Sequence, residues 1–264
     1  MESSLLKQIA DNTEKTARNT EPKKSFYIFL REKGSRIRTD FNPSIELDTN
    51  KNYEMALLNL ETYYSFPNID ATNNNFTYSP DDDTDWITIK VPEGCYEITE
   101  INECIQRIMK RRGHYDETNS EYCISIQPNT NTLKSVLNIA PGYRVNFDLK
   151  NSIRSVLGFE RLLYRSGYNE SQNLVNIMSI STLRVTNDII GSSYSNGTAE
   201  NVIHSFFPNV GPGYKIFEVP HNLIYLPITL SSISTMTTAL TDQNGKQVNL
   251  RGEDLTIRFH IREV

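Results

Sequence analysis

The chain has 264 residues, a mass of 30.3 kDa and a formal net charge of −5. This length suffices for one large β domain, and the acidic balance argues against binding nucleic acid through the whole surface. No window approaches the roughly 18 to 20 apolar residues that a membrane helix requires, and Met1–Lys7 lacks the apolar region of a secretory signal. We therefore expect a protein made in the cytosol with reduced thiols at Cys95, Cys104 and Cys123, which have no metal-ligand spacing.

Residues 1–24 contain almost no core-forming side chains and are rich in Asn, Thr, Glu and Lys. This composition predicts a flexible N-terminal arm. Leu5, Leu6 and Ile9 can share one helical face, too small to fold alone but sufficient to dock on a partner. They are the candidate partner-binding residues, and a plain disordered tail is the alternative interpretation.

Charge is unevenly distributed along the chain. Residues 1–40 carry nine Lys or Arg against six Asp or Glu, whereas residues 41–100 carry two against twelve. The two segments either have different surroundings or are both ordinary solvated surface.

Strands are expected at Ser25–Leu30, Ser44–Leu47 and Tyr53–Tyr64, where apolar residues dominate one face. The polar stretch 67–80 is expected to be a loop on the rim of a sandwich. Asp81–Asp85 offers clustered carboxylates, but it lacks the glycine and the distal glutamate of a calcium loop. We interpret it as an acidic, solvated turn.

One helix is expected after Thr99, which can cap its N-terminus. Ile101, Ile105 and Ile108 fall on a single face, and Gly113 ends the helix. The helix is predicted to cover one end or edge of the sandwich.

Short strands then recur to the end of the chain. In the last one, Leu255, Ile257, Phe259 and Ile261 alternate with polar residues, which is typical of a strand with one buried face. The other expected strands are Trp86–Val91, Tyr122–Ile126, Leu133–Ile139, Tyr143–Phe147, Ile180–Thr186, Val202–Phe207, Lys215–Val219, Leu223–Ile228 and Ile233–Leu240, with a single helical turn in Asn151–Phe159. The pattern predicts an all-β fold over residues 25–264: a single jelly-roll sandwich with one core, one covering α-helix and extended loops.

No catalytic constellation is evident. His114, His204, His221 and His260 are scattered, without the His-x-His and Glu of a metal-binding cupin, and His260 is expected on the polar face of the last strand. There is no nucleophile elbow, P-loop or dinucleotide fingerprint. The sequence predicts no enzyme, no cofactor and no metal site.

Several segments, taken in order, resemble the minor capsid (penton) proteins of Polinton or Maverick elements and adintovirus-like viruses. The resemblance spans residues 50–264 and is carried by Trp86–Tyr96, Ser152–Phe159, Val185–Ile190, Gly213–Pro220, Tyr225–Pro227 and Asp242–Glu253.

The resemblance implies a jelly-roll subunit that forms a homopentamer at the five-fold vertex of an icosahedral capsid. Double jelly-roll major capsid proteins would surround it. The basic arm would point inward, to neighbouring capsid proteins or genome, while loops around Asn73 and Gly191–Gly197 would face outward. No specific nucleic-acid recognition is expected.

A rival interpretation is a glycan- or receptor-binding jelly-roll attachment protein that works as a monomer or trimer. The fourteen tyrosines support it, because aromatic rings in rim loops can stack on sugars.

Overall fold

The computed structural model describes residues 23–264 except 82–83, 117–120, 179, 192 and 196. Leu5, Leu6 and Ile9 lie outside the described residues. The described chain is mostly antiparallel β-structure, which confirms the predicted all-β class.

A five-stranded and a four-stranded sheet form a sandwich, and eight of its nine strands have four residues or more. The first sheet has the order β1-β20-β3-β17, with the short β18 also paired to β3, and the second has the order β16-β13-β19-β2. The strands are β1 (Ser25–Lys33), β2 (Arg36–Glu46), β3 (Tyr53–Tyr63), β13 (Leu183–Asn187), β16 (Val202–Phe206), β17 (Lys215–Glu218), β18 (Leu226–Pro227), β19 (Ser232–Thr241) and β20 (Asp254–Glu263). A hairpin of β14 (Ser193–Ser195) and β15 (Thr198–Glu200) lies between β13 and β16.

The pairing order is that of a jelly roll. Taking the eight strands in sequence, the first pairs with the eighth, the second with the seventh, the third with the sixth and the fourth with the fifth. Such a set of pairs is one long hairpin wound into two sheets. The predicted jelly roll is therefore confirmed by the strand register.

The core of the sandwich lies between the two sheets. Leu255, Ile257, Phe259 and Ile261 of β20 are all fully buried there, as their alternation with polar residues predicts. β1 runs antiparallel to β20 along its whole length, with Ser25 opposite Arg262 and Lys33 opposite Asp254.

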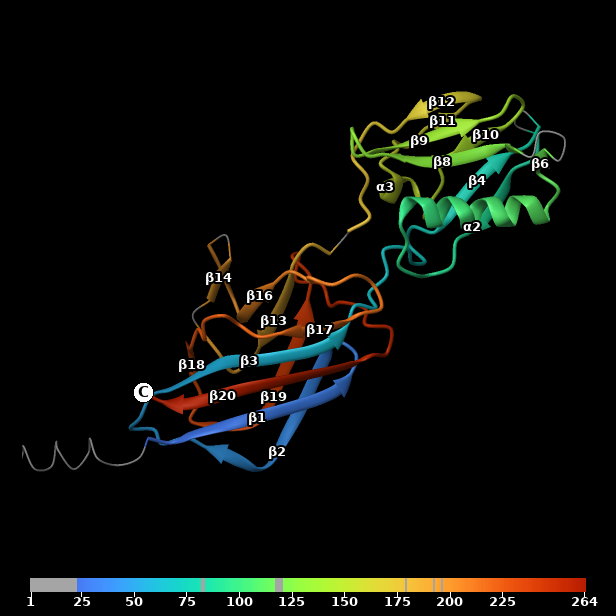
Figure 1. The fold of residues 1–264 in the computed structure, drawn as a ribbon. Helices are drawn as coiled ribbons and strands as arrows, with labels where there is room; N and C mark the ends of the chain where they lie inside the picture. The colour runs from blue at the N-terminus through green and yellow to red at the C-terminus, as the bar shows by residue number, and fades with distance from the viewer. Residues whose placement is uncertain (1–22, 82–83, 117–120, 179, 192, 196) are drawn as a thin grey trace, which may run out of the picture.

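A second module is inserted between β3 and β13, the third and fourth strands of the jelly roll. It contains one sheet of order β11-β10-β4-β5, another of order β12-β9-β8, and a small β6–β7 hairpin. Its elements are β4 (Asn75–Ser79), β5 (Ile87–Lys90), α2 (Ile98–Arg111), β6 (Tyr115–Asp116), β7 (Glu121–Tyr122), β8 (Ile124–Asn129), β9 (Lys134–Ile139), β10 (Arg144–Asn146), α3 (Arg154–Leu157), β11 (Leu163–Tyr164) and β12 (Gly167–Glu170). It stands off one end of the sandwich (Figure 1).

The buried side chains form two clusters, so the prediction of one core is corrected. The stretch 67–80, expected to be a rim loop, contains β4. Phe76 and Tyr78 of this strand are fully buried in the core of the inserted module. The run of asparagines before Phe76 conceals the strand, because asparagine is typical of turns.

The helix exists but differs from its prediction in two respects. It begins with a capping box in which the Glu97 backbone N–H donates to the Glu100 side chain at 2.8 Å, so Thr99 is not the cap. It also packs against β8 of the inserted module and does not cover the sandwich. Ile101 and Ile105 are buried in that module's core, which explains the apolar face.

α2 closes the free edge of β8. The Asn102 Oδ1 atom accepts a hydrogen bond from the Ile126 backbone N–H at 2.8 Å. One turn later, the Gln106 amide donates to the Ile124 carbonyl at 3.3 Å. The two side chains take the place of a neighbouring strand and protect an edge that would otherwise be open to pairing.

Candidate assembly surface

The outer face of the first sheet carries exposed aromatic side chains. Tyr27 and Phe29 of β1, Tyr63 of β3 and Phe217 of β17 make up this aromatic face. Tyr27 is 68% exposed and Phe217 is 56% exposed. Tyr27 and Phe29 lie on one edge strand, Phe217 on the other, and Tyr63 on the central strand β3, so the rings are spread across the sheet.

Strand periodicity explains why these rings point outward. In β1, Ile28 and Leu30 are buried in the core, and Tyr27 and Phe29 therefore lie on the opposite side of the pleat. Tyr27 pairs in register with His260, and Phe29 with Arg258.

Arginines of β20 lie among the aromatic rings. The Arg258 guanidinium is 5.4 Å from the centre of the Phe29 ring, and Arg258 forms no ion pair with any other described residue. The Arg262 guanidinium lies 3.5 Å from the Tyr225 ring centre and 3.0 Å from the Glu54 carboxylate. The face thus combines aromatic rings with cations on the neighbouring strand.

His260 lies on this outer face, as the alternation in β20 predicts. Its Nε2 is 2.6 Å from the Ser25 hydroxyl and its Nδ1 is 2.7 Å from the Tyr225 hydroxyl. Burial lowers the pKa of His260, and the positive charge of Arg262 lowers this pKa further. The two hydroxyl contacts hold the ring in place on the sheet.

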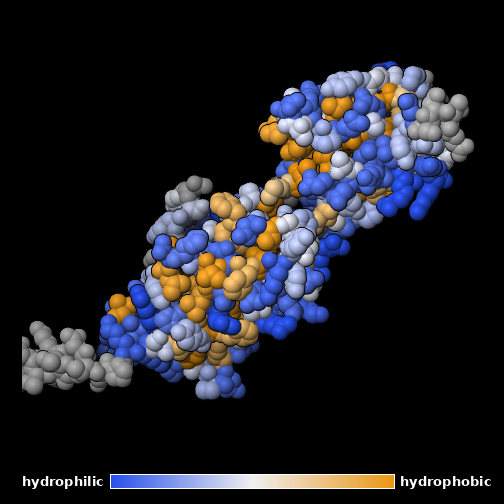
Figure 2. All heavy atoms as spheres, in the orientation of Figure 1, coloured by the Kyte–Doolittle hydropathy of each residue, from blue (hydrophilic) through white to orange (hydrophobic). Residues whose placement is uncertain are grey.

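Figure 2 shows hydrophobic residues gathered among charged ones over the sandwich, on the side where the first sheet faces the viewer. Aromatic residues and arginine are the residue types enriched in the centres of protein–protein interfaces. The aromatic face therefore has the composition of an interface between proteins.

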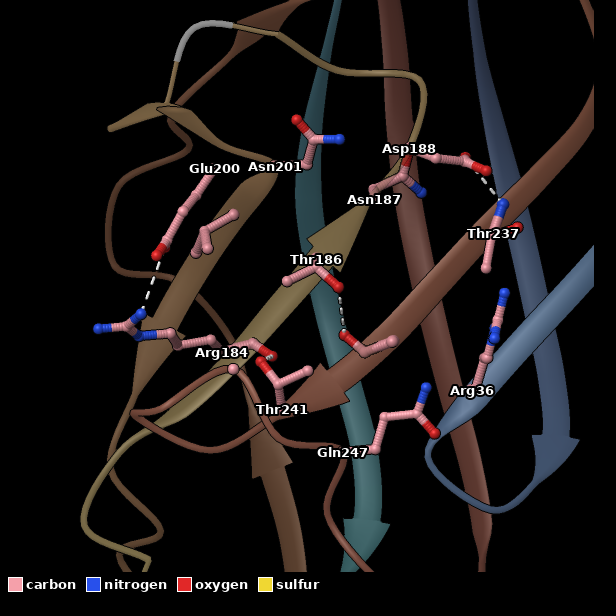
Figure 3. Close-up of a pocket in the computed structure, with 13 residues that line it drawn as sticks. Arg36, Arg184, Thr186, Asn187, Asp188, Glu200, Asn201, Thr237, Thr241 and Gln247 are labelled. Carbon is pink, nitrogen blue, oxygen red and sulfur yellow. Dashed lines mark hydrogen bonds and ion pairs between the residues drawn. The ribbon is translucent and has the colours of Figure 1, made fainter. Parts of the chain in front are cut away.

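The second sheet presents a different outer face. A hollow of about 480 Å³ lies there, and most of the residues that line it are of polar or charged types, such as Arg36, Arg184 and Asp188. Figure 3 shows Arg184 directed at Glu200, with nitrogen and oxygen 3.2 Å apart, and the Asp188 carboxylate accepting a hydrogen bond from the Thr237 backbone N–H. The sandwich thus has one aromatic and one polar outer face.

The remaining histidines and the cysteines are dispersed. The Tyr78 hydroxyl lies 2.7 Å from His114 Nδ1, and His204 Nε2 lies 2.9 Å from the Glu218 carboxylate. The three cysteines form no disulfide. Across the described residues, no group of three or more His, Cys, Asp or Glu side chains is placed to hold a metal ion.

The acidic turn is only partly described, because residues 82 and 83 are outside the described chain. The Asp81 carboxylate accepts hydrogen bonds from the Thr84 hydroxyl, the Asp85 backbone N–H and the Ser79 hydroxyl. These bonds, that of Thr84 first, lower the pKa of Asp81 to about 2. Asp81 therefore organises its own turn.

The sequence reasoning did not single out the aromatic face. Ser25–Leu30 is nearly all apolar, so its alternation is hidden. The pairing of β1 with β20 is what indicates the face. Tyr27 and Phe29 lie opposite His260 and Arg258, which are on the polar side of β20, and therefore point away from the core.

No protein-family model matches the chain, and no curated protein matches it. Among solved structures, it is similar to the mavirus penton protein, with 10% sequence identity and a TM-score of 0.47 over 91% of this chain and 100% of that one. It also matches the D2-D3 domains of the flagellar cap protein FliD from Escherichia coli, with 12% identity and a TM-score of 0.15 over 88% and 98% of the two chains. None of the helices in the described chain is long and apolar enough to cross a membrane.

Proposed function

We propose that the protein is a minor capsid subunit whose copies close into a ring of five at the vertices of an icosahedral particle. The observation that carries the proposal is a jelly-roll sandwich with one interface-like and one polar outer face. A closed ring uses a heterologous contact, in which one surface of each copy meets a different surface of the next. A sandwich with two unlike sides meets this requirement.

In this arrangement the aromatic face makes the contact between copies. Phe29 and Phe217 lose their exposure in the ring, and Arg258, which forms no ion pair with another described residue, gains an acidic partner from the next copy. Residues 25–264 act as one capsid subunit, with double jelly-roll major capsid proteins as outer neighbours. The N-terminal arm of residues 1–24 points inward, where Leu5, Leu6 and Ile9 dock on a neighbour.

The test is the mass of the purified protein in solution, measured by light scattering at several concentrations. We expect a species of five times 30.3 kDa. The double variant Phe29→Ser and Phe217→Ser is expected to lower that mass to the monomer. Leu162→Ser, which removes an exposed apolar side chain in the inserted module and away from both outer faces of the sandwich, is the control and is expected to leave the mass unchanged.

A trimer would contradict the ring of five and favour an attachment protein. If the protein is a monomer at every concentration, it is co-expressed with a double jelly-roll major capsid protein and the particles are imaged by electron microscopy. Absence of this chain from the vertices would then refute the proposal.

A further inference from the structure

The inserted module carries an open groove that the capsid proposal does not use. The groove has a volume of about 820 Å³, within the range of small-ligand sites. One wall is α2, the floor is the outer face of the β12-β9-β8 sheet, and the ends are formed by residues near Tyr122 and Pro141.

The floor of the groove is a row of polar side chains that crosses three strands. Ser125 of β8 pairs in register with Asn138 of β9, and Asn138 pairs with Tyr168 of β12. Residues in register on one face of a sheet have neighbouring side chains, so the three form one line. With strands spaced about 4.8 Å apart, the row is about 10 Å long.

These polar groups are available to a ligand. The side chains of Ser125, Gln127 and Asn138 form no hydrogen bond within the described part of the chain. Hydroxyl and amide groups each both donate and accept, so the floor can pair with a ligand whose groups do the same. Tyr168, which is 67% exposed, adds a ring at the end of the row, and Tyr122 adds a second ring at one end of the groove.

The charges in the groove exclude other classes of ligand. Among the described residues, its lining includes one carboxylate, Glu121, and no Lys, Arg or His. Nucleic acids and sulfated glycans are bound largely through cations, and a sialyl carboxylate would be repelled by Glu121 with no cation in the described lining to offset it. A peptide cannot add as a strand beside β8, because Asn102 and Gln106 already occupy that edge.

We propose that this groove binds a neutral oligosaccharide. The ligand's hydroxyl groups pair with Ser125, Asn138 and Gln127, and the apolar face of a sugar ring packs on Tyr168. The inference is independent of the number of copies in the assembly, since the groove lies within the inserted module of one chain.

The test uses the full chain and a panel of neutral oligosaccharides: maltohexaose, chitotetraose, mannopentaose and lactose. Sialyllactose and a heparin tetrasaccharide are the charged comparisons. Binding is measured by saturation-transfer NMR at millimolar ligand, and affinity by titration. We expect at least one neutral probe to bind and both charged probes to bind more weakly or not at all.

Three variants locate the site. Tyr168→Ala is expected to weaken binding about tenfold because the stacking ring is lost, and Asn138→Leu to weaken it by a similar factor while keeping the side chain's size. Tyr194→Ala, on the exposed β14–β15 hairpin of the jelly roll, removes a tyrosine that is 74% exposed and is expected to change nothing. Circular dichroism of each variant confirms that it is folded.

Three results would overturn the proposal: no binding of any neutral probe, preferential binding of the charged probes, or binding unaffected by both Tyr168→Ala and Asn138→Leu in folded protein. Each is distinct from the mass measurement, so failure of the groove and failure of the ring are separate outcomes.

Discussion

At the scale of single residues, His260 makes the aromatic face sensitive to pH. Its pKa is lowered by burial and by Arg262, so the folded protein binds a proton at this site less readily than the unfolded chain does. The stabilising contribution is present above the unfolded value of about 6.5 and is lost as the pH falls through the lower folded value. We expect an NMR titration of the His260 ring to give a pKa below 6.5.

The same effect is measurable as stability. The free energy of unfolding should fall as the pH is lowered from 7 to 5, and His260→Gln should remove part of that fall while keeping a polar side chain. His221, which is exposed and outside the strands, provides the control variant His221→Gln. An equal pH dependence in His260→Gln and the unaltered protein would contradict this assignment.

At the scale of elements, a single substitution can measure how much the contact between α2 and β8 stabilises the fold. Asn102→Ala leaves the Ile126 N–H without its partner, which is expected to cost about 1–3 kcal/mol. Glu103→Ala, one residue further along the helix and exposed, is the matched control with an expected change within about 0.5 kcal/mol. Urea unfolding of the two variants measures both values, and equal losses would show that the edge contact contributes nothing.

Elements were predicted from the sequence where local chemistry determines them. The last strand alternates apolar and polar residues, and the single helical turn expected in Asn151–Phe159 is α3, which ends at Gly158 with a positive φ of 81°. The helix was placed correctly in the sequence but wrongly in space. The apolar face of the helix indicates that the helix packs against a hydrophobic core. Only the tertiary structure shows that this core is the one around Ile124 and Leu137 in the inserted module.

The groove and the aromatic face could not be read from the chain for a similar reason. Ser125, Asn138 and Tyr168 become neighbours only through strand register, and the register was not predicted. The long polar stretch before Phe76 also hid the start of a second core. A turn that leads into a buried strand and an exposed loop are built from the same polar residue types, so composition does not distinguish them.

At the scale of the whole molecule, the two cores predict that the sandwich survives without its insertion. All eight jelly-roll strands lie outside residues 69–177. Replacing those residues with a short Gly-Ser linker makes the chain between β3 and β13 about ten times shorter. If that chain is treated as a flexible loop, the entropic free energy needed to bring its ends together falls by about 2 kcal/mol. We expect a folded β-protein with one cooperative unfolding transition, measured by circular dichroism and hydrogen exchange.

Contacts at the base of the inserted module oppose that gain. The Asn68 side chain donates to the carbonyls of Tyr96 and Ile177 at 2.8 and 3.0 Å, and so joins both connections at the base of the inserted module. A variant in which Asn68→Ala is made in the full chain separates the loss of this contact from the loss of the module. An excised protein that aggregates or lacks protected amides would show that the sandwich needs the insertion to fold.

Because β1 and β20 are antiparallel, the start of β1 and the end of β20 lie at the same end of the sandwich. Lys24 and Glu263 are hydrogen-bonded neighbours, with the Glu263 backbone N–H 2.8 Å from the Lys24 carbonyl oxygen. The C-terminal end of β20 and the start of β1 lie at the end of the sandwich away from the inserted module (Figure 1). A peptide or fluorescent label joined at either position would emerge at this end of the sandwich and leave the groove in the inserted module unobstructed. In a ring of parallel copies, labels would crowd one rim and bound sugars the other, so the two could be distinguished on a single particle.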